Sequence, residues 1–300
     1  MAYPTDVKIF WCDPGMTSIG PFAGGTAARG TLIAALDACL VDGYGLKTAD
    51  TVVVSGGVAT VTISTGHEYG KWQVALIAGA TPAGLNGQKR ILSATTNTFT
   101  FDATGIPDGT ATGTITTKIA PLGWTRPFTG TNKRAYRIDT VANPTASTMY
   151  LRVDESTFNQ AAQMLVYETM SDIDTGTGRV PTAGQAANGY FTSKSESTTS
   201  TSYRYWCIIG DARGFYIINH SYSSLLTISS NYAGYVSFFG DPVSLDEADP
   251  YKFIIGTDNG GDTVGSPSST YLLFVNTPSY IKRTRSANRV TQSVDVQLRG

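Results

Sequence analysis

The sequence predicts a mainly β protein, with a small β-sandwich or barrel, a larger β-sandwich-like domain, one short N-terminal helix and extended termini. Short runs of β-branched and aromatic residues recur along the chain and alternate with Gly, Pro and Asn. Only 15% of the 300 residues are charged and 41% are hydrophobic, so small polar residues, which favour strands and turns, make up the balance. Before residue 150, a single segment has convincing helical periodicity.

Residues 1–49 are expected to form an N-terminal arm and the helix. A short strand is predicted over 7–11, but the Gly- and Ala-rich sequence around it has too little apolar periodicity to pack alone. We therefore expect residues 1–28 to lie along another subunit or domain. Over 29–42, apolar residues recur at the three- and four-residue spacing of an amphipathic helix, which Gly43 ends.

Residues 50–120 are predicted to form a small Ig-like β domain. Valine-rich runs lie on either side of Gly56 and Gly57, as in a β-hairpin. The tripeptides LNG and PDG supply Asn and Gly for turns that need positive φ. Further strands are expected at 72–79, 88–94, 98–103 and 111–120.

Residues 121–281 are predicted to form a larger, aromatic-rich β domain. Its clearest hairpin is YRYWCIIGDARGFYIINHS, in which two aromatic-rich runs flank a four-residue turn. The polar stretch 181–202 lacks periodicity, so we expect a surface insertion that is either mobile or ordered by a partner. Strands are expected at 135–139, 148–154, 161–170, 203–211, 214–221, 232–241, 251–258 and 270–277.

Residues 282–300 form a basic C-terminal arm with five positive side chains and one negative, a local charge of +4. Acidic residues are bunched upstream, between 241 and 262. Opposite charges on copies of one chain favour head-to-tail contact, so this arm is expected to reach a neighbouring subunit. The alternative interpretation is a solvated tail with little structure.

Composition argues against several classes of partner. The net charge of −1 supplies no field that would concentrate polyanions, so we expect no nucleic-acid partner. We expect no membrane insertion, because no run of about 18 apolar residues occurs. Cys12, Cys39 and Cys207 are odd in number and widely spaced, which fits neither a disulfide framework nor a zinc site and favours a reducing compartment.

No sequence motif indicates an enzyme, so we assign no catalytic, cofactor-binding or metal-binding residue. His67 and His220 are too few for a histidine metal site, and neither has a Cys, Asp or Glu at ligand spacing. The sequence gives no positive indication of the two carboxylates that a glycosidase uses. Asp172 and Asp174, followed by Gly176, are similar to the start of a calcium loop, but the distal ligands are missing.

A turn in which Asp side chains accept hydrogen bonds from nearby amides explains residues 172–176 better than a calcium loop, and the same holds for DNGGD at 258–262. The aromatic side chains also have two interpretations, a core or a face that stacks on sugars. Alternation along strands favours the core. The residues concerned are Trp72, Trp124, Trp206, Tyr203, Tyr205, Tyr216, Tyr222, Tyr232 and Tyr235.

Residues 60–120 combine a strand ending in GH, an apolar strand followed by GA, an LNG turn, the strand TNTFTFD and a closing GTATG. This pattern resembles a module repeated in virion proteins of tailed bacteriophages. The flanking sequences TLIAALDACLVDGYGLKTAD, APLGWTRPFTGTNKRAYR, YETMSDIDTGTGRVPT and GDARGFYIIN extend the resemblance over most of the chain.

The resemblance implies a structural component of the virion, in the tail, baseplate or neck or decorating the capsid. Its partners would be copies of itself and other virion proteins, and it would be assembled in the cytoplasm of the bacterial host. No collagen-like, coiled-coil or β-helical repeat of a long fibre is present. The alternative function is a module of the phage tail that binds a host receptor or a surface glycan.

Overall fold

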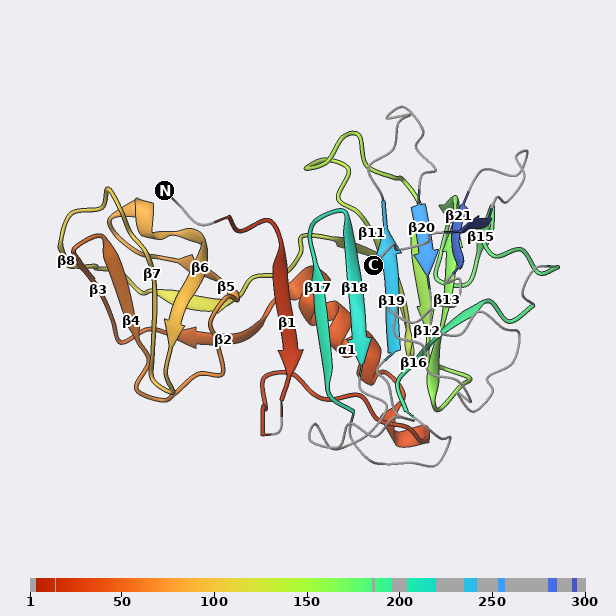
Figure 1. The fold of residues 1–300 in the computed structure, drawn as a ribbon, viewed down its shortest axis with the longest axis horizontal. Helices are drawn as coiled ribbons and strands as arrows, with labels where there is room; N and C mark the ends of the chain where they lie inside the picture. Colours follow the sequence, from red (N-terminus) through yellow and green to blue (C-terminus); the bar gives the residue numbers. More distant parts are fainter. Residues whose placement is uncertain are drawn as a thin grey trace.

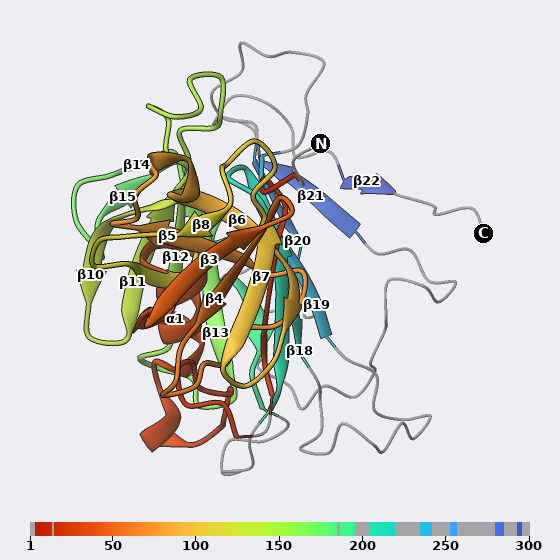
Figure 2. The same cartoon turned by 90° about the vertical axis from the view of Figure 1, so that its left-hand side faces the viewer.

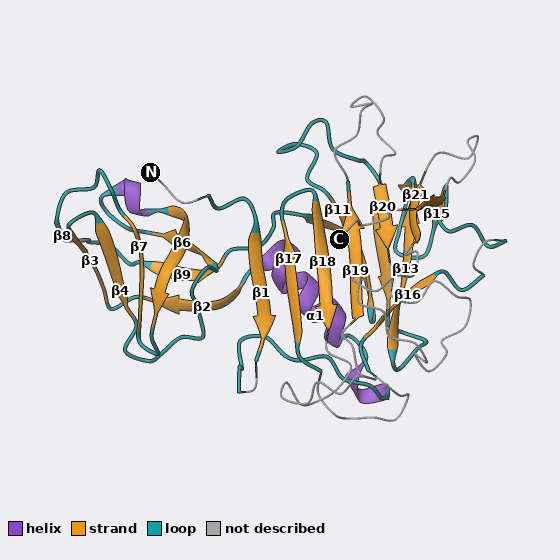
Figure 3. Ribbon diagram, viewed as in Figure 1, coloured by secondary structure: helices purple, strands orange, loops and turns teal. Residues whose placement is uncertain are grey.

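The computed structural model describes residues 4–13, 15–184, 187–195, 204–219, 235–241, 253–256, 280–284 and 293–295. In these residues it confirms a mainly β fold with a short α-helix near the N-terminus (Figure 3). Figure 1 shows two β units side by side. We call the unit formed by residues 44–119 the small unit, and we call the N-terminal strand and helix together with the strands from residue 125 onward the large unit.

The small unit is one curled antiparallel sheet in the order β2-β9-β5-β6-β7-β4-β3-β8. Its strands are β2 (Tyr44–Thr48), β3 (Thr51–Ser55), β4 (Val58–Thr62), β5 (Val74–Ala78), β6 (Gly87–Ala94), β7 (Thr98–Asp102), β8 (Gly109–Thr110) and β9 (Thr116–Ile119), and the 3-10 turn η3 spans Ala83–Leu85. The register of β6 shifts between Ile91 and Ser93, and such a bulge bends a strand. Residues 87–90 of β6 pair with β5 and residues 91–94 pair with β7, so the bulge lies just after the point where the partner strand changes.

Buried and exposed side chains alternate along the strands of this sheet, as the sequence predicts, and the buried ones form its core. In β3, Val52 and Val54 are buried, whereas Val53 is 39% exposed. Phe99 and Phe101 of β7 are fully buried in the same core. The hairpin at Gly56 and Gly57 is also confirmed, because β3 and β4 pair on either side of it. The sheet also includes two strands that the sequence does not predict. These are β2, which pairs with β9, and the two-residue β8, which pairs with β3.

The large unit contains two antiparallel sheets. The five-stranded sheet has the order β10 (Thr125–Gly130), β11 (Lys133–Arg137), β12 (Tyr150–Asp154), β13 (Ala161–Tyr167) and β16 (Tyr190–Ser193), beside a ribbon of β14 (Thr169–Met170) and β15 (Gly176–Thr177). The seven-stranded sheet has the order β1 (Lys8–Cys12), β17 (Trp206–Gly210), β18 (Gly214–Asn219), β19 (Tyr235–Gly240), β20 (Phe253–Gly256), β21 (Tyr280–Thr284) and β22 (Ser293–Asp295). Figure 2 shows β10–β13 and β18–β20 on opposite sides of this unit.

The structure confirms the helix that the apolar periodicity over 29–42 predicts. After the 3-10 turn η1 (Thr26–Ala28), α1 spans Thr31–Leu36 and continues into one π-helical turn, η2 (Asp37–Asp42). Its apolar stripe, which includes Leu32, Leu36 and Leu40, is fully buried. The hydroxyl of Tyr136 in β11 donates to the carbonyl of Ile33, so the helix is held against the five-stranded sheet.

One expectation about the irregular segments agrees with the structure and two change. The N-terminal strand lies along the large unit of its own chain, because β1 pairs with β17 over residues 8–12. The expected surface insertion 181–202 is wrong in part, since β16 and the two residues after it are buried and pair with β13 or the chain near it. The expected C-terminal arm, 282–300, begins inside a strand, because β21 pairs with β20.

Candidate functional site

Ionisable side chains in the described residues join separate elements of the fold at several places, including the pairing of Arg126 and Arg134 with Asp37 of η2. Three further places also tie separate elements together. The first is the start of the helix, where Glu155 and Lys194 are both fully buried. The second is the outer surface of the five-stranded sheet around Arg152. The third is the junction between the two units, around Glu68 and Arg90.

Glu155 and Lys194 form a buried ion pair, with 2.5 Å between Lys194 Nζ and Glu155 Oε2. The carboxylate also accepts hydrogen bonds from the amides of Gly30 at 2.9 Å and Ile33 at 2.7 Å, which are free donors at the start of the helix. Lys194 donates a further bond to the carbonyl of Ala28 at 2.8 Å. The pair therefore joins β12, β16 and the helix in the dry interior.

No pattern in the sequence predicts this ion pair. Glu155 follows β12 directly, and Lys194 follows β16, so the sheet brings together two residues that are 39 positions apart. Lys194 lies in the polar sequence YFTSKSES, which has the composition of a surface loop. No local pattern distinguishes a buried lysine from a solvated one, because the pairing of β13 with β16 is a long-range contact.

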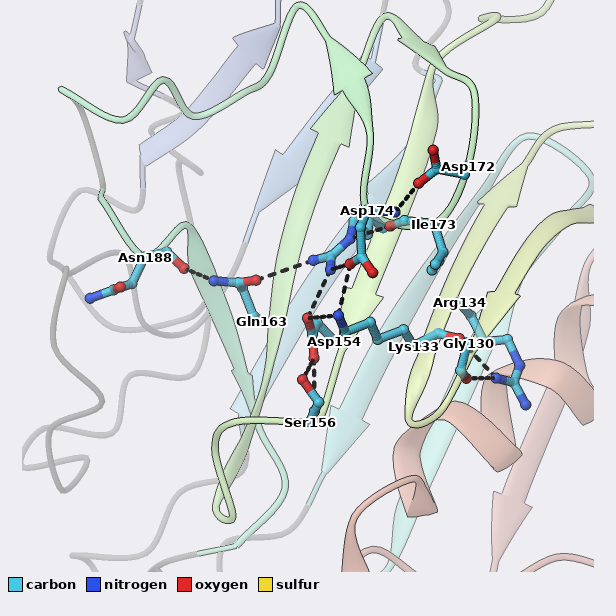
Figure 4. Close-up of polar contacts among 11 residues, drawn as sticks. Gly130, Lys133, Arg134, Asp154, Ser156, Gln163, Asp172, Ile173, Asp174 and Asn188 are labelled. Atoms are coloured by element: carbon cyan, nitrogen blue, oxygen red, sulfur yellow. Dashed lines mark hydrogen bonds and ion pairs between the residues drawn. The ribbon is translucent and has the colours of Figure 1, made fainter.

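The second cluster is centred on Arg152, whose side chain is 9% exposed. Its neighbours Lys133, Asp154 and Asp174 are labelled in Figure 4. The guanidinium of Arg152 donates to Asp154 at 2.9 Å, to Asp174 at 2.7 Å and to the carbonyl of Ile173 at 2.7 Å. Lys133 Nζ lies 2.7 Å from the same Asp174 oxygen. The two cations lower the pKa of Asp174, Lys133 first and Arg152 second. The cluster contains two cations and two carboxylates, so its charges balance. Through Asp174 it holds the 171–175 turn against the sheet.

This geometry confirms the turn interpretation of the acidic segment. The amide of Asp174 donates to Asp172 Oδ1 at 2.8 Å, and this bond from the Asp174 amide lowers the pKa of Asp172. Gly176 lies in β15 instead of a ligand loop. In the described ranges, no group of three or more His, Cys, Asp or Glu side chains could hold a metal ion. The segment 258–262 lies outside the described residues.

At the junction, Glu68 of the small unit holds the loop that follows β1. Its carboxylate accepts bonds from the amides of Thr17 at 2.7 Å and Ser18 at 2.9 Å and from both hydroxyls. Burial alone would raise the pKa of Glu68, but the bonds from Ser18 and Thr17 outweigh it and lower the pKa to about 2. The carboxylate is therefore ionised at neutral pH and accepts these four hydrogen bonds from the loop.

Arg90 holds the other end of the N-terminal segment. Its guanidinium donates to the carbonyls of Pro4 and Val7 and, on its own unit, to that of Trp72. The segment thus touches the small unit before β1 and again after it. A hollow of about 410 Å³ lies at this junction, and it is lined by Trp11, Asp13, Gly15, Met16, Glu68, Tyr69 and Gly70.

The remaining residues considered from the sequence occupy the interior or its margin. His67 is buried in the small unit, where its Nδ1 accepts a bond from the Tyr69 amide and burial lowers its pKa. His220 lies outside the described residues. The three cysteines are free thiols, and burial raises the pKa of Cys12 and of Cys207 to about 11.

The core interpretation is confirmed for two of the three tryptophans. Trp124 and Trp206 are each 3% exposed, and Trp206 stacks on Phe22 with 5.4 Å between ring centroids. Trp72 and Tyr216 are 50% and 43% exposed. Tyr205 is partly buried against the core, and the side chains of Tyr203, Tyr222, Tyr232 and Tyr235 lie outside the described residues.

Comparison with known proteins gives no family for this chain. No protein-family model matches it, and no curated protein is significantly similar to it. Within the part of the chain that the structure describes, no helix has both the length and the apolar character needed to cross a membrane.

Proposed function

We propose that this chain is a structural subunit of a tailed-phage virion and that it acts by assembling with copies of itself and with other virion proteins. The observation that carries this proposal is that three carboxylates of the chain, from the fully buried Glu155 to the exposed Asp174, are engaged in contacts within the chain. Glu155, Asp174 and Glu68 each accept several bonds from this chain and tie separate elements together. A general acid or base must instead reach a substrate proton.

The N-terminal segment adds support from the architecture. It crosses from the small unit to the seven-stranded sheet through β1 and is fixed on both sides of that strand by Arg90 and Glu68. Two β units linked in this way resist relative motion, which suits a component that must present its surfaces in a fixed geometry. The sequence resemblance to virion proteins points to the same role, in the tail, baseplate, neck or capsid surface.

The alternative, a host-receptor or glycan-binding module, has less support. Sugar binding needs open aromatic ring faces, and the core takes up Trp124 and Trp206. Trp72 is exposed, on a left-handed backbone with φ of 74°, but the ammonium of Lys71 lies 4.6 Å from the ring centroid and covers one face. We therefore rank assembly above recognition of a sugar.

Quantitative mass spectrometry of gradient-purified phage particles tests the proposal. The chain should copurify with infectivity at a fixed ratio to the major capsid protein, and hundreds of copies would indicate a shell or tail tube, whereas tens would indicate a neck or baseplate. A non-virion protein from the same lysate is the control and should be depleted. A chain that is abundant in the lysate but depleted from particles to the same degree as this control would refute the proposal.

A further inference from the structure

The outer face of the seven-stranded sheet is apolar across four neighbouring strands. Strand pairing aligns its outward side chains in two rows that run across β1, β17, β18 and β19. We call these eight residues the apolar face. The first row is Ile9, Ile209, Tyr216 and Phe238, and the second is Trp11, Cys207, Ile218 and Val236.

This face is a second apolar surface on a sheet whose other side already lines the core. The side chains that alternate with it, including Phe10, Ile208 and Phe215, are fully buried. Among the described elements, α1 lies behind these strands in Figure 1, on the core side. An antiparallel sheet with one solvated face normally carries polar residues there. The apolar face carries no charged side chain, which indicates a surface that another molecule covers.

Exposure is greatest at the middle of the face. Tyr216 is 43% exposed and its ring lies 4.7 Å from that of Phe238, centroid to centroid. The other members of the two rows are half-buried, because neighbouring side chains crowd each other. At one edge, Trp11 also packs on Gly70 of the small unit. A central aromatic pair surrounded by aliphatic side chains is typical of the energetic centre of a protein interface.

The size of the face fits the centre of a dimer interface. Four strands about 4.8 Å apart, each about 17 Å long, cover about 320 Å². A standard interface buries about 800 Å² on each partner, with an apolar centre and a polar rim. The apolar face therefore supplies a centre of suitable size, and the ends of the strands and their loops would supply the rim.

We propose that the apolar face binds the same face of a second copy of this chain, in a two-fold symmetric sheet-on-sheet contact. A flat sheet face complements itself at the usual spacing of about 10 Å between packed sheets. Because the face is uncharged, bringing two copies together causes no like-charge repulsion. A lipid surface would instead favour basic residues around the apolar side chains. This inference concerns the isolated protein and goes beyond its role in a virion.

The test compares the full chain with two lysine variants by sedimentation equilibrium over a range of concentrations. Tyr216→Lys places a charge at the centre of the apolar face. Val141→Lys is the matched control, because Val141 is 89% exposed and lies outside this face. The wild type and the control should approach twice the 31.8 kDa chain mass, with the Tyr216 variant at least tenfold weaker in association.

Circular dichroism melting checks that the Tyr216 variant remains folded, and Tyr216→Ser provides a second variant if it does not. A monomeric wild type at every concentration would overturn the proposal. A dimer that all the variants retain equally would overturn it as well, because a different surface would then form the contact. If dimers form as expected but the chain is absent from particles, this inference stands and the proposed function fails.

Discussion

Replacing Lys194 with methionine should destabilise the large unit strongly. The substitution keeps the length of the side chain but removes the ammonium that contacts Glu155 and donates to Ala28, and it leaves a fully buried carboxylate without its cation. Removing one partner of a buried ion pair costs about 3–5 kcal/mol. Total stabilities are about 5–15 kcal/mol, so the loss is a large fraction of the free energy of unfolding.

Urea unfolding followed by tryptophan fluorescence measures this loss, because Trp124 and Trp206 are buried in the large unit. With a slope of about 2–3 kcal/mol per molar urea, the midpoint should fall by about 1–2.5 M. Lys71→Met, at an exposed lysine, is the control and should change stability by no more than about 1 kcal/mol, because it removes only the exposed contact with the Trp72 ring.

The double variant Lys194→Met with Glu155→Gln should recover part of the loss, because it leaves no unpaired buried charge and the amide oxygen can still accept from the helix. If Lys194→Met unfolds at the wild-type urea concentration, the ion pair does not hold the helix against the five-stranded sheet. If the loss of stability in the double variant equals the sum of the losses in the two single variants, the two side chains do not interact as a charge pair.

Three further changes test the other contacts. Glu68→Gln should speed hydrogen exchange of the two amides that it binds, a loss of about 1 kcal/mol after discounting for solvent screening. In the wild type this contribution is complete above the ordinary pKa of 4.5 and is lost as the pH falls toward the folded value of about 2. Arg152→Gln should lower the free energy of unfolding by about 2–4 kcal/mol, measured by urea titration. Gly70→Ala should cost about 1–3 kcal/mol in thermal melts, because a Cβ there would lie 2.2 Å from the Trp11 ring, whereas Gly20→Ala meets open space and should be neutral.

Each of these predictions has a contradicting result. Protection factors of the two amides that stay constant between pH 4.5 and pH 2, after correction for the intrinsic exchange rate, would show that Glu68 does not hold the loop. If the Arg152 variant is as stable as the wild type, then water replaces the hydrogen bonds of Arg152 to the turn, and Arg152 does not stabilise it. Equal melting temperatures for the two glycine variants would show that the Trp11 ring has room to move away.

Local patterns predicted the elements whose contacts are close in sequence. The helix follows from the spacing of Leu32 and Leu36, and the hairpin of β3 and β4 follows from alternation around two glycines. The turn at Asp172 follows from the ability of an Asp side chain to accept from a nearby amide. In each case the physical cause lies within a few residues, so the sequence carries it directly.

Long-range pairing determined what the sequence did not reveal. β1 pairs with β17, about 200 residues later, so nothing near Lys8 indicates its partner. β16 has only four residues and all of them are buried, so it lacks the alternation that marks a half-exposed strand. The apolar face was hidden for a related reason, because its members become neighbours only when four strands align in register.

Electron cryo-microscopy of the purified phage particle tests the central claim most directly, because that claim is that the chain works as a fixed part of an assembly. The account predicts repeated density into which the small and large units fit together as one body, with the N-terminal segment passing between them. A reconstruction in which every protein density is assigned and none accommodates these two units would contradict it.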